Sequence, residues 1–341
     1  MSNLTYSILT CALHEHTYIN AFISHYANLG FQAFYILCDK NQPSYSDIII
    51  PRDNIKINLI QMNYPDNKNH LFDSIQIMYY NNVVKNIDSD WILLCDIDEF
   101  LYLKEITIQN YMNILLQKLP NVSQVSFPWM IIDQLSKDNL NMFDNMKDNK
   151  WFSNPHVKSM FKKKALSVVN NQYKIYPHDS MVNGPTYFQK GISPPRKLNG
   201  SYQNTFDIQY YRNNSFFIHF HVRSFKNNVV KLLTNHYAKK SDDNQKNKFL
   251  NIASNKLFDY LPLRKFSLIP SHQSNKQIPH FDLIHLNTNI LPNYIDYNDK
   301  LFDSLIQKYK LDKEYFNKIL ENPQIVIHPS STLYIAPENN S

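Results

Sequence analysis

Apolar residues along the first 132 positions follow two alternating patterns. Continuous apolar runs of strand length are separated by stretches in which apolar residues recur every three or four positions. The first pattern is typical of buried strands and the second of amphipathic helices. The runs predict strands at 5–13, 31–39, 55–62, 91–95 and 122–132, and the helical spacing predicts helices at about 19–29, 70–87 and 107–119.

The first predicted helix carries signals at both of its ends. Its apolar residues between Ile19 and Ala27 fall on one face. Thr17 is predicted to cap the N-terminus, and Gly30 stands where a glycine commonly ends a helix.

The regular alternation predicts an α/β fold built from βαβ units, with a mostly parallel sheet flanked by helices. The unbroken apolar run at 91–95 is what a strand buried on both faces requires. In open α/β sheets, ligands bind beyond the carboxyl ends of the strands. Asp39, Asp96 and Asp98 all follow predicted strands, so they are the first candidate functional residues.

The rest of the chain is less regular. Periodicity is weak over 133–215, but "SFFIHFHVRSF" (215–225) alternates as a strand does, with His219, His221 and Arg223 on its polar face. From 236 onward the chain is rich in Asn and Lys, with one helix predicted near 300–320. We therefore predict a domain over 1–235 and a mainly helical or irregular C-terminal extension over 236–341.

Composition narrows the function classes. The chain has 341 residues, of which 43% are hydrophobic, enough for a sizeable core. It has only 4 glycines and no G-x-G-x-x-G, which argues against glycine-rich phosphate loops. The net charge of +6 suits an anionic small-molecule partner. Nucleic acid is not predicted as a partner, because no basic helix or arginine-rich run is present.

The cysteines and the N-terminus bear on the compartment. Cys11, Cys38 and Cys95 form no C-x-x-C and are odd in number, so we expect buried free thiols. The first residues resemble a strand rather than a signal peptide. No window approaches 18 apolar residues. We expect no transmembrane segment and a cytoplasmic location.

Carboxylates and histidines supply the candidate metal chemistry. Asp96 and Asp98, in a chain that turns after a strand, can converge on one hard cation, Mg²⁺, Mn²⁺ or Ca²⁺. A solvated turn is the alternative. His14-x-His16 and His219-x-His221 are either ligand pairs or chance, and an imidazole joining the carboxylates would favour Mn²⁺. Arg223 suits either a phosphate or a structural carboxylate.

Several segments resemble one enzyme family. "WILLCDIDEFLYL" (91–103) resembles the D-x-D-E-F core of family-2-like and family-92-like glycosyltransferases with the GT-A fold. The segment 13–39 is similar to that family's N-terminal motif, although His14 and Ala21-Phe22 depart from it. Residues 76–81, Lys158-Ser159 and 218–225 resemble further family segments. The resemblance spans about residues 5–235.

The resemblance implies a GT-A-like, Rossmann-related fold and a nucleotide-sugar donor, with a UDP-sugar as the expected one. By this likeness Asp39 contacts the base or ribose, Asp96 lies near the ribose or metal, and Asp98 binds the metal. His219 is a further metal or diphosphate ligand. The full set of expected donor-binding residues is Cys11, Glu15, Asp39, Asp96, Lys158 and Arg223.

A catalytic base is expected among three acidic residues. Asp133, after the fifth strand, and Asp179, in "YPHDS", are two candidates. Glu99 is the third, with the alternative that it organises the turn. The predicted activity is Mn²⁺- or Mg²⁺-dependent transfer of a sugar to a hydroxyl on a glycan, glycoprotein or lipid. A metal-dependent hydrolase and an inactive glycan-binding relative are the alternatives.

Overall fold

The computed structural model describes residues 4–40, 42–63, 72–104, 107–136, 150–188, 191–192, 214–224, 230, 277–278, 296–310, 325–328 and 332–335. Its helices are α1 (Ile19–Asn28), α2 (Phe72–Val83), α3 (Ile108–Lys118) and α7 (Asp296–Lys308), with 3-10 turns η1 (Val84–Asn86) and η3 (Lys163–Ala165). Its first seven strands are β1 (Tyr6–Ala12), β2 (Ala33–Asp39), β3 (Lys56–Met62), β4 (Trp91–Leu94), β5 (Glu99–Tyr102), β6 (Gln124–Ser136) and β7 (Lys150–Lys162). The others are β8 (Val168–Val169), β9 (Gln172–Tyr173), β10 (Thr186–Phe188), β11 (Gly191–Ile192), β12 (Phe216–Ser224), β13 (Gln277–Ile278), β14 (Ile325–His328) and β15 (Thr332–Ile335).

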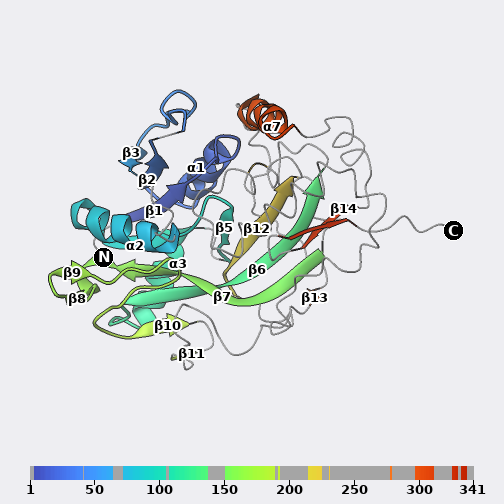
Figure 1. Cartoon of the computed structure of the whole chain (residues 1–341). Helices are drawn as coiled ribbons and strands as arrows, with labels where there is room; N and C mark the ends of the chain where they lie inside the picture. Colours follow the sequence, from blue (N-terminus) through green and yellow to red (C-terminus); the bar gives the residue numbers. More distant parts are fainter. Residues whose placement is uncertain are drawn as a thin grey trace.

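One large sheet organises the described chain (Figure 1). Its main path is β11-β10-β6-β7-β4-β1-β2-β3, and β12 lies between β6 and β5. The four strands β4-β1-β2-β3 run parallel, and β10 and β12 run parallel to β6. The predicted α/β class with a mostly parallel, helix-flanked sheet is therefore confirmed, and it is compatible with a Rossmann-like fold. One feature was not predicted: β7 runs antiparallel between β4 and β6.

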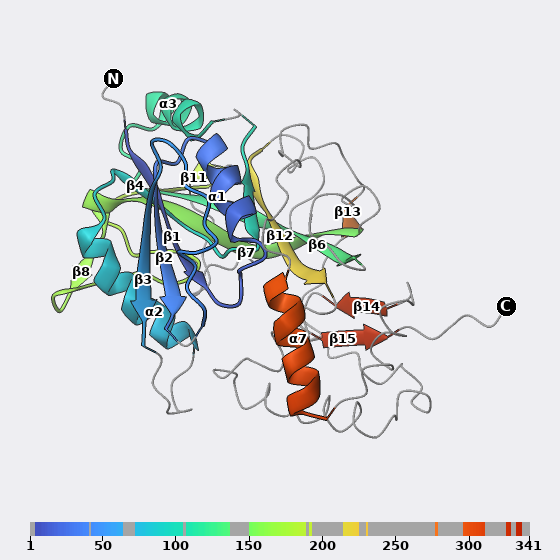
Figure 2. The same ribbon diagram turned by 90° about the horizontal axis from the view of Figure 1, so that it is seen from above.

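Helices cover both faces of the parallel strands (Figure 2). Alternate side chains of β1, β2 and β4 pack with α1 and α3 in one buried cluster. The intervening side chains, such as Leu9, Leu37 and Ile92, pack with α2 in a second cluster. Because strand side chains alternate between faces, the continuous apolar runs are explained by burial on both sides.

The ends of α1 differ in how well the sequence predicted them. The N-cap is Tyr18, without a side-chain capping bond, so the prediction that Thr17 caps the helix was wrong. Gly30 does end it: its φ is +98°, in the left-handed region that glycine tolerates best. The N–H of Phe31 then donates to the carbonyl of Tyr26.

The fifth predicted strand is longer than its sequence pattern suggested. β6 continues to Ser136, so Asp133 lies inside the strand and not after it. The reason is pairing on both edges, because Asp133 lies opposite Lys150 of β7 and Val222 of β12. These partners come from later in the chain and leave no local signal in 122–136.

The described part of the predicted C-terminal extension contains both helix and strand. α7 overlaps the start of the helix predicted near 300–320, and 311–320 lie outside the described residues. β14 and β15 form a hairpin that was not predicted. The boundary at 235 also lies outside the described residues. Of the helices described, none combines the length and apolar character that crossing a membrane requires.

Candidate functional site

Asp96, Asp98 and Glu99 lie in a closed turn between β4 and β5. The N–H of Glu99 donates to the carbonyl of Asp96, 3.1 Å away. The N–H of Asp96 in turn donates to Oε2 of Glu99, 2.8 Å away. These reciprocal bonds hold the D-x-D segment in one bent conformation, so its carboxylates are not forced onto opposite faces as in an extended strand.

A buried lysine from β7 neutralises part of this turn. Nζ of Lys158 lies 2.7 Å from Oδ2 of Asp96 and 3.4 Å from Oε2 of Glu99. The side chains of Lys158 and Glu99 are 1% and 0% exposed, whereas that of Asp96 is 38% exposed. Burial alone would lower the pKa of Lys158, but the Asp96 and Glu99 carboxylates outweigh it and raise that pKa. The ammonium therefore stays charged inside the protein.

Burial changes the pKa of Glu99, the second acidic partner of Lys158, in the opposite direction. It raises the pKa of Glu99 well above its ordinary value, with the nearby Lys158 ammonium opposing the rise. Glu99 thus lies beneath the turn as a hydrogen-bond acceptor for Asp96. This geometry favours the turn-organising role that the sequence left open for it.

Asp98 lies beside His219 of β12. Oδ1 of Asp98 and Nε2 of His219 are 3.7 Å apart, and both side chains are mostly buried. The backbone fixes this approach, since the N–H of Phe220 donates to the carbonyl of Asp98 at 2.8 Å and His219 lies opposite Glu99 in the β5–β12 pairing. Two atoms that ligate one ion at about 2.1 Å lie about 3 to 4 Å apart, so this pair fits a shared divalent cation.

The protein side of such a centre is incomplete without a bound ligand. Within the described residues, no group of three or more His, Cys, Asp or Glu side chains has metal-ligating geometry. Asp98 and His219 would therefore hold a cation together with other oxygens, such as those of a substrate or water. Open coordination of this kind is what Mg²⁺ shows when it binds through a few carboxylates and substrate phosphates.

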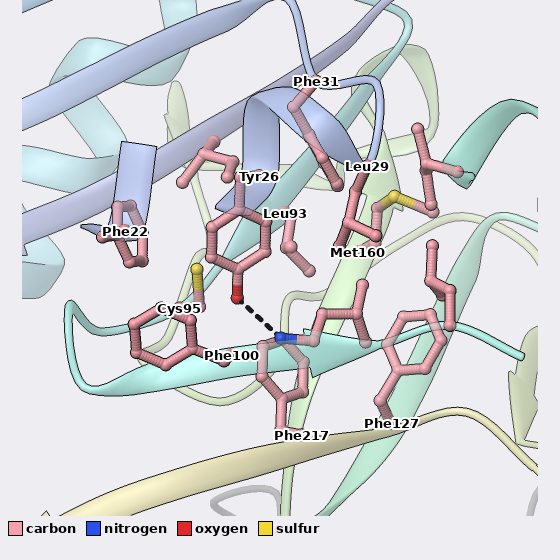
Figure 3. Packing of buried hydrophobic residues seen from close by; sticks show 14 of the residues in the cluster. Phe22, Tyr26, Leu29, Phe31, Leu93, Cys95, Phe100, Phe127, Met160 and Phe217 are labelled. Carbon is pink, nitrogen blue, oxygen red and sulfur yellow. Dashed lines mark hydrogen bonds between the residues drawn. The ribbon is translucent and has the colours of Figure 1, made fainter. Parts of the chain in front are cut away.

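Two residues of α1 fix the strand that follows the turn. The hydroxyl of Tyr26 donates to the carbonyl of Glu99 at 2.8 Å. It also accepts a hydrogen bond from the N–H of Leu101 at 3.1 Å, which is the dashed line in Figure 3. His25 donates from Nε2 to the carbonyl of Leu101 at 2.9 Å. On this edge of β5, side chains of a helix take the place of a neighbouring strand. The buried aromatic cluster around Tyr26 therefore positions the turn.

The other predicted donor-binding residues lie at the same edge of the sheet. Glu15 and Asp39 follow β1 or end β2, and both are buried. Leu9 of β1 pairs with Leu94, the last residue of β4, and Cys11 and Asp96 each follow that pair by two positions at the same edge of the sheet. Burial raises the pKa of Tyr80, and the negative charge of Asp96 raises it further.

The remaining candidates are only partly described. Asp133 and Arg223 belong to β6 and β12, but their side chains lie outside the described part of the structure. Asp179 lies in a tight turn, in which its backbone carbonyl accepts the N–H of Tyr176 at 2.9 Å. It follows His178, whose Nδ1 lies 3.2 Å from the carbonyl oxygen of Val157 in β7, next to Lys158.

Sequence reasoning missed three residues next to this site. The ring of Trp129 contacts that of His219, with centroids 4.5 Å apart, and also those of His156 and His178, at 5.2 Å each. His156 and His178 come from the stretch in which periodicity is weak, and Trp129 comes from the strand before it. One usable signal was Pro155, since a proline within an extended run marks a bulge.

Comparison with known proteins adds no identification. No family model and no curated protein matches the chain. Solved structures that resemble it include HddC from Yersinia pseudotuberculosis (12% identity, TM-score 0.30, covering 54% of this chain and 89% of that one). Another is 4-diphosphocytidyl-2C-methyl-D-erythritol synthase from Anaerococcus prevotii (10% identity, TM-score 0.26, covering 47% and 72%). Likeness at these TM-scores carries no information on what this chain binds or does.

Proposed function

We propose that this protein is a metal-dependent glycosyltransferase of the GT-A type. It would move a sugar from a nucleotide-sugar to a hydroxyl group of a glycan, glycoprotein or lipid. A UDP-sugar is the proposed donor. The observation that carries the proposal is the pair formed by Asp98 and His219, 3.7 Å apart at the carboxyl edge of a parallel sheet. The D-x-D-E-F sequence supports it, because that pattern resembles the metal-binding segment of such enzymes.

The proposed cation is Mn²⁺ or Mg²⁺, held by Asp98 and His219. The imidazole among oxygen ligands favours Mn²⁺. When bound, such an ion would neutralise the diphosphate and make the nucleotide a better leaving group. Asp96, paired with Lys158, stands beside the ion as a ligand or as a ribose contact.

The proposed donor lies across the ends of β1, β2 and β4. Cys11, Glu15 and Asp39 line this edge, and Asp39 is assigned to the base or ribose. Arg223 is assigned to the diphosphate, for which a guanidinium offers two parallel donors. Lys158 is 1% exposed and already bonded to Asp96, so it supports donor binding through that carboxylate.

The base that activates the acceptor must come within about 2.6 to 3.2 Å of the hydroxyl. Glu99 is 0% exposed and bonded within the turn, which leaves Asp133 and Asp179 as the better candidates. Of these, Asp179 has a half-buried side chain within the described structure. Substituting each by Asn and measuring transfer separately from donor hydrolysis would distinguish them.

The test of the proposed function is a thermal shift assay followed by a donor screen. Mn²⁺ and UDP together should raise the melting temperature by several degrees, since a ligand at 100 times its Kd stabilises by about 2.7 kcal/mol. Asp98→Ala should lose this shift, while Asp88→Asn, an exposed carboxylate before β4, should keep it. UDP-sugars are then screened with Mn²⁺ for released UDP. If UDP, GDP and every nucleotide-sugar leave the melting temperature unchanged, the proposal fails. Hydrolysis that needs no nucleotide would instead support the alternative of a metal-dependent hydrolase.

A further inference from the structure

A second group of polar side chains adjoins the Asp98–His219 pair. It is centred on a bulge in β7, where Pro128 pairs with Val157 but the next residue, Trp129, pairs with Asn154. The extra residues of β7 therefore project from the regular ladder, and His156 is one of them. Bulges re-aim side chains and are frequent next to active sites.

The hydrogen bonds of His156 determine which ring nitrogen carries its proton. Oδ1 of the buried Asn154 accepts the backbone N–H of His156 at 2.9 Å, so this atom is the amide oxygen. The same oxygen lies 2.7 Å from Nδ1 of the His156 ring. An oxygen acceptor requires a donor, so Nδ1 carries the proton and Nε2 of the neutral ring carries a lone pair.

His178 has the same arrangement from a different segment. Its Nδ1 lies 3.2 Å from the carbonyl oxygen of Val157, so Nδ1 again donates and Nε2 is left as an acceptor. The two rings are 5.4 Å apart. Within the described residues, the hydrogen bonds of both rings are made by Nδ1. Both side chains are half-buried, so each is open to solvent in part.

The charge state of the two rings follows from their surroundings. Burial lowers the pKa of both histidines, and the Lys158 ammonium lowers each further, that of His178 to about 3. The imidazoles therefore stay neutral at physiological pH and keep their acceptor nitrogens. A neutral ring without a proton on Nε2 accepts a hydrogen bond from a hydroxyl but cannot donate one to a phosphate.

We propose that His156 and His178 form a sugar-binding subsite, in which Nε2 of each accepts a hydrogen bond from a hydroxyl group of a sugar ring. Trp129 contacts both rings and His219, which places this subsite beside the proposed cation. The sugar is either that of the donor or that of the acceptor. The proposal deepens the proposed function and rests on it for the reaction, although sugar binding can be measured without turnover.

The subsite is tested by saturation-transfer NMR with two probes. Methyl α- and β-glycosides of glucose, galactose and mannose stand for the acceptor, and UDP-glucose and UDP-galactose with Mn²⁺ stand for the donor. Four single variants are compared with the unsubstituted protein. His156→Asn and His178→Asn place an amide near Nδ1 and remove the group at Nε2, whereas His156→Gln and His178→Gln place an amide oxygen near Nε2.

The expected result is a weakening confined to the Asn variants. Loss of one hydrogen bond should raise the Kd for the bound sugar about tenfold in each Asn variant, and the Gln variants should stay within about threefold. Weakened methyl glycosides identify the acceptor sugar, and weakened UDP-sugars with unchanged UDP identify the donor sugar. Equal affinities in all four variants, or no saturation transfer to any sugar probe, would overturn the subsite.

Two further measurements accompany the affinities. The ¹⁵N shifts test which ring nitrogen is protonated, and the melting temperatures separate a folding defect from a binding defect. Imidazole ¹⁵N shifts of the unsubstituted protein should show His156 and His178 protonated at Nδ1 near pH 7. Protonation at Nε2 in either ring would overturn the proposal whatever the variants do. Melting temperatures show that each variant is folded. Failure of the proposed function appears elsewhere, as the absence of a UDP and Mn²⁺ effect that depends on Asp98.

Discussion

Nζ of Lys158 lies 2.7 Å from Oδ2 of Asp96, and this contact joins two segments 62 positions apart in the chain. It places one buried positive charge under a turn that carries three carboxylates. The pair leaves Asp98, which has His219 as its neighbour, as the carboxylate best placed for an added cation. The negative charge that follows β4 is thus divided between an internal partner and a proposed ion.

Lys158→Met should destabilise the protein by about 3 kcal/mol, because removing one member of a buried ion pair leaves the other without compensation. Asp96 is partly exposed and can recover some hydration, so the lower end of the usual range is expected. Urea denaturation at pH 7 measures the change. Lys164→Met removes an exposed lysine and should change the free energy of unfolding by less than about 0.5 kcal/mol.

A double variant sharpens this prediction. Glu99→Gln removes one carboxylate that Lys158 faces, so Lys158→Met combined with Glu99→Gln should cost less than the sum of the two single changes. Such coupling is expected for groups in direct contact. Strict additivity would show that Lys158 does not stabilise the turn through its contact with Glu99.

His219→Ala and Asp98→Asn should each weaken Mn²⁺ binding by about 100-fold, since changes to groups around a bound metal already cost 10- to 100-fold. Mn²⁺ affinity is followed by the loss of the free-ion signal in electron paramagnetic resonance, with UDP present. Asp88→Asn is the matched control, because it removes an exposed carboxylate before β4 instead of after it. Unaltered Mn²⁺ affinity in the His219 variant would remove that imidazole from the metal site.

The part of the fold that local patterns predict is the parallel half. β1, β2 and β4 are buried on both faces, so each of them requires a continuous run of apolar residues. The antiparallel place of β7 between β4 and β6 was not predicted, because it depends on pairing with strands far away in sequence. The extension of β6 past Asp133 has the same origin.

The candidate site divides in a similar way. Asp96 and Asp98 follow a recognisable strand, so their place at its end could be predicted. The partner of each could not, because Lys158 and His219 reach the turn only through the sheet order. The places of His156 and His178 could not be predicted from residue spacing, since a bulge and a tight turn determine where they lie.

Tyr26→Phe should lower the free energy of unfolding by about 1 to 3 kcal/mol, because it leaves the buried carbonyl of Glu99 and N–H of Leu101 without their partner. The ring itself is kept, so packing changes little. Thermal and urea unfolding measure the loss. Because these bonds hold β5, Mn²⁺ affinity should fall as well.

Tyr6→Phe is the matched control for that variant. Tyr6 is also fully buried, but within the described structure its hydroxyl makes no hydrogen bond. Removing it should leave stability unchanged or slightly raised, since an unsatisfied buried hydroxyl is itself unfavourable. Equal losses in the two variants would mean that the loss in Tyr26→Phe does not arise from its bonds to β5.

His25 makes the stability of the protein depend on pH. Burial lowers its pKa from 6.5 to about 4, although its hydrogen bond to the Leu101 carbonyl opposes the shift. Below pH 6.5 the His25 ring therefore binds a proton in the unfolded chain but not in the folded protein. The contribution of His25 is complete above pH 6.5 and is lost as the pH falls toward 4. Between pH 7.5 and pH 5.0 the loss should be about 2 kcal/mol.

His25→Gln isolates this contribution, because glutamine cannot titrate and can still place an amide N–H near the Leu101 carbonyl. The free energy of unfolding of both proteins is measured by urea denaturation at pH 7.5 and pH 5.0. Other buried histidines, such as His178, contribute equally in both proteins and cancel in the comparison. The variant should therefore lose about 2 kcal/mol less than the unsubstituted protein over this interval. Identical losses would show that His25 is already protonated in the folded protein at pH 5.0, and so that its contact with β5 does not require a neutral ring.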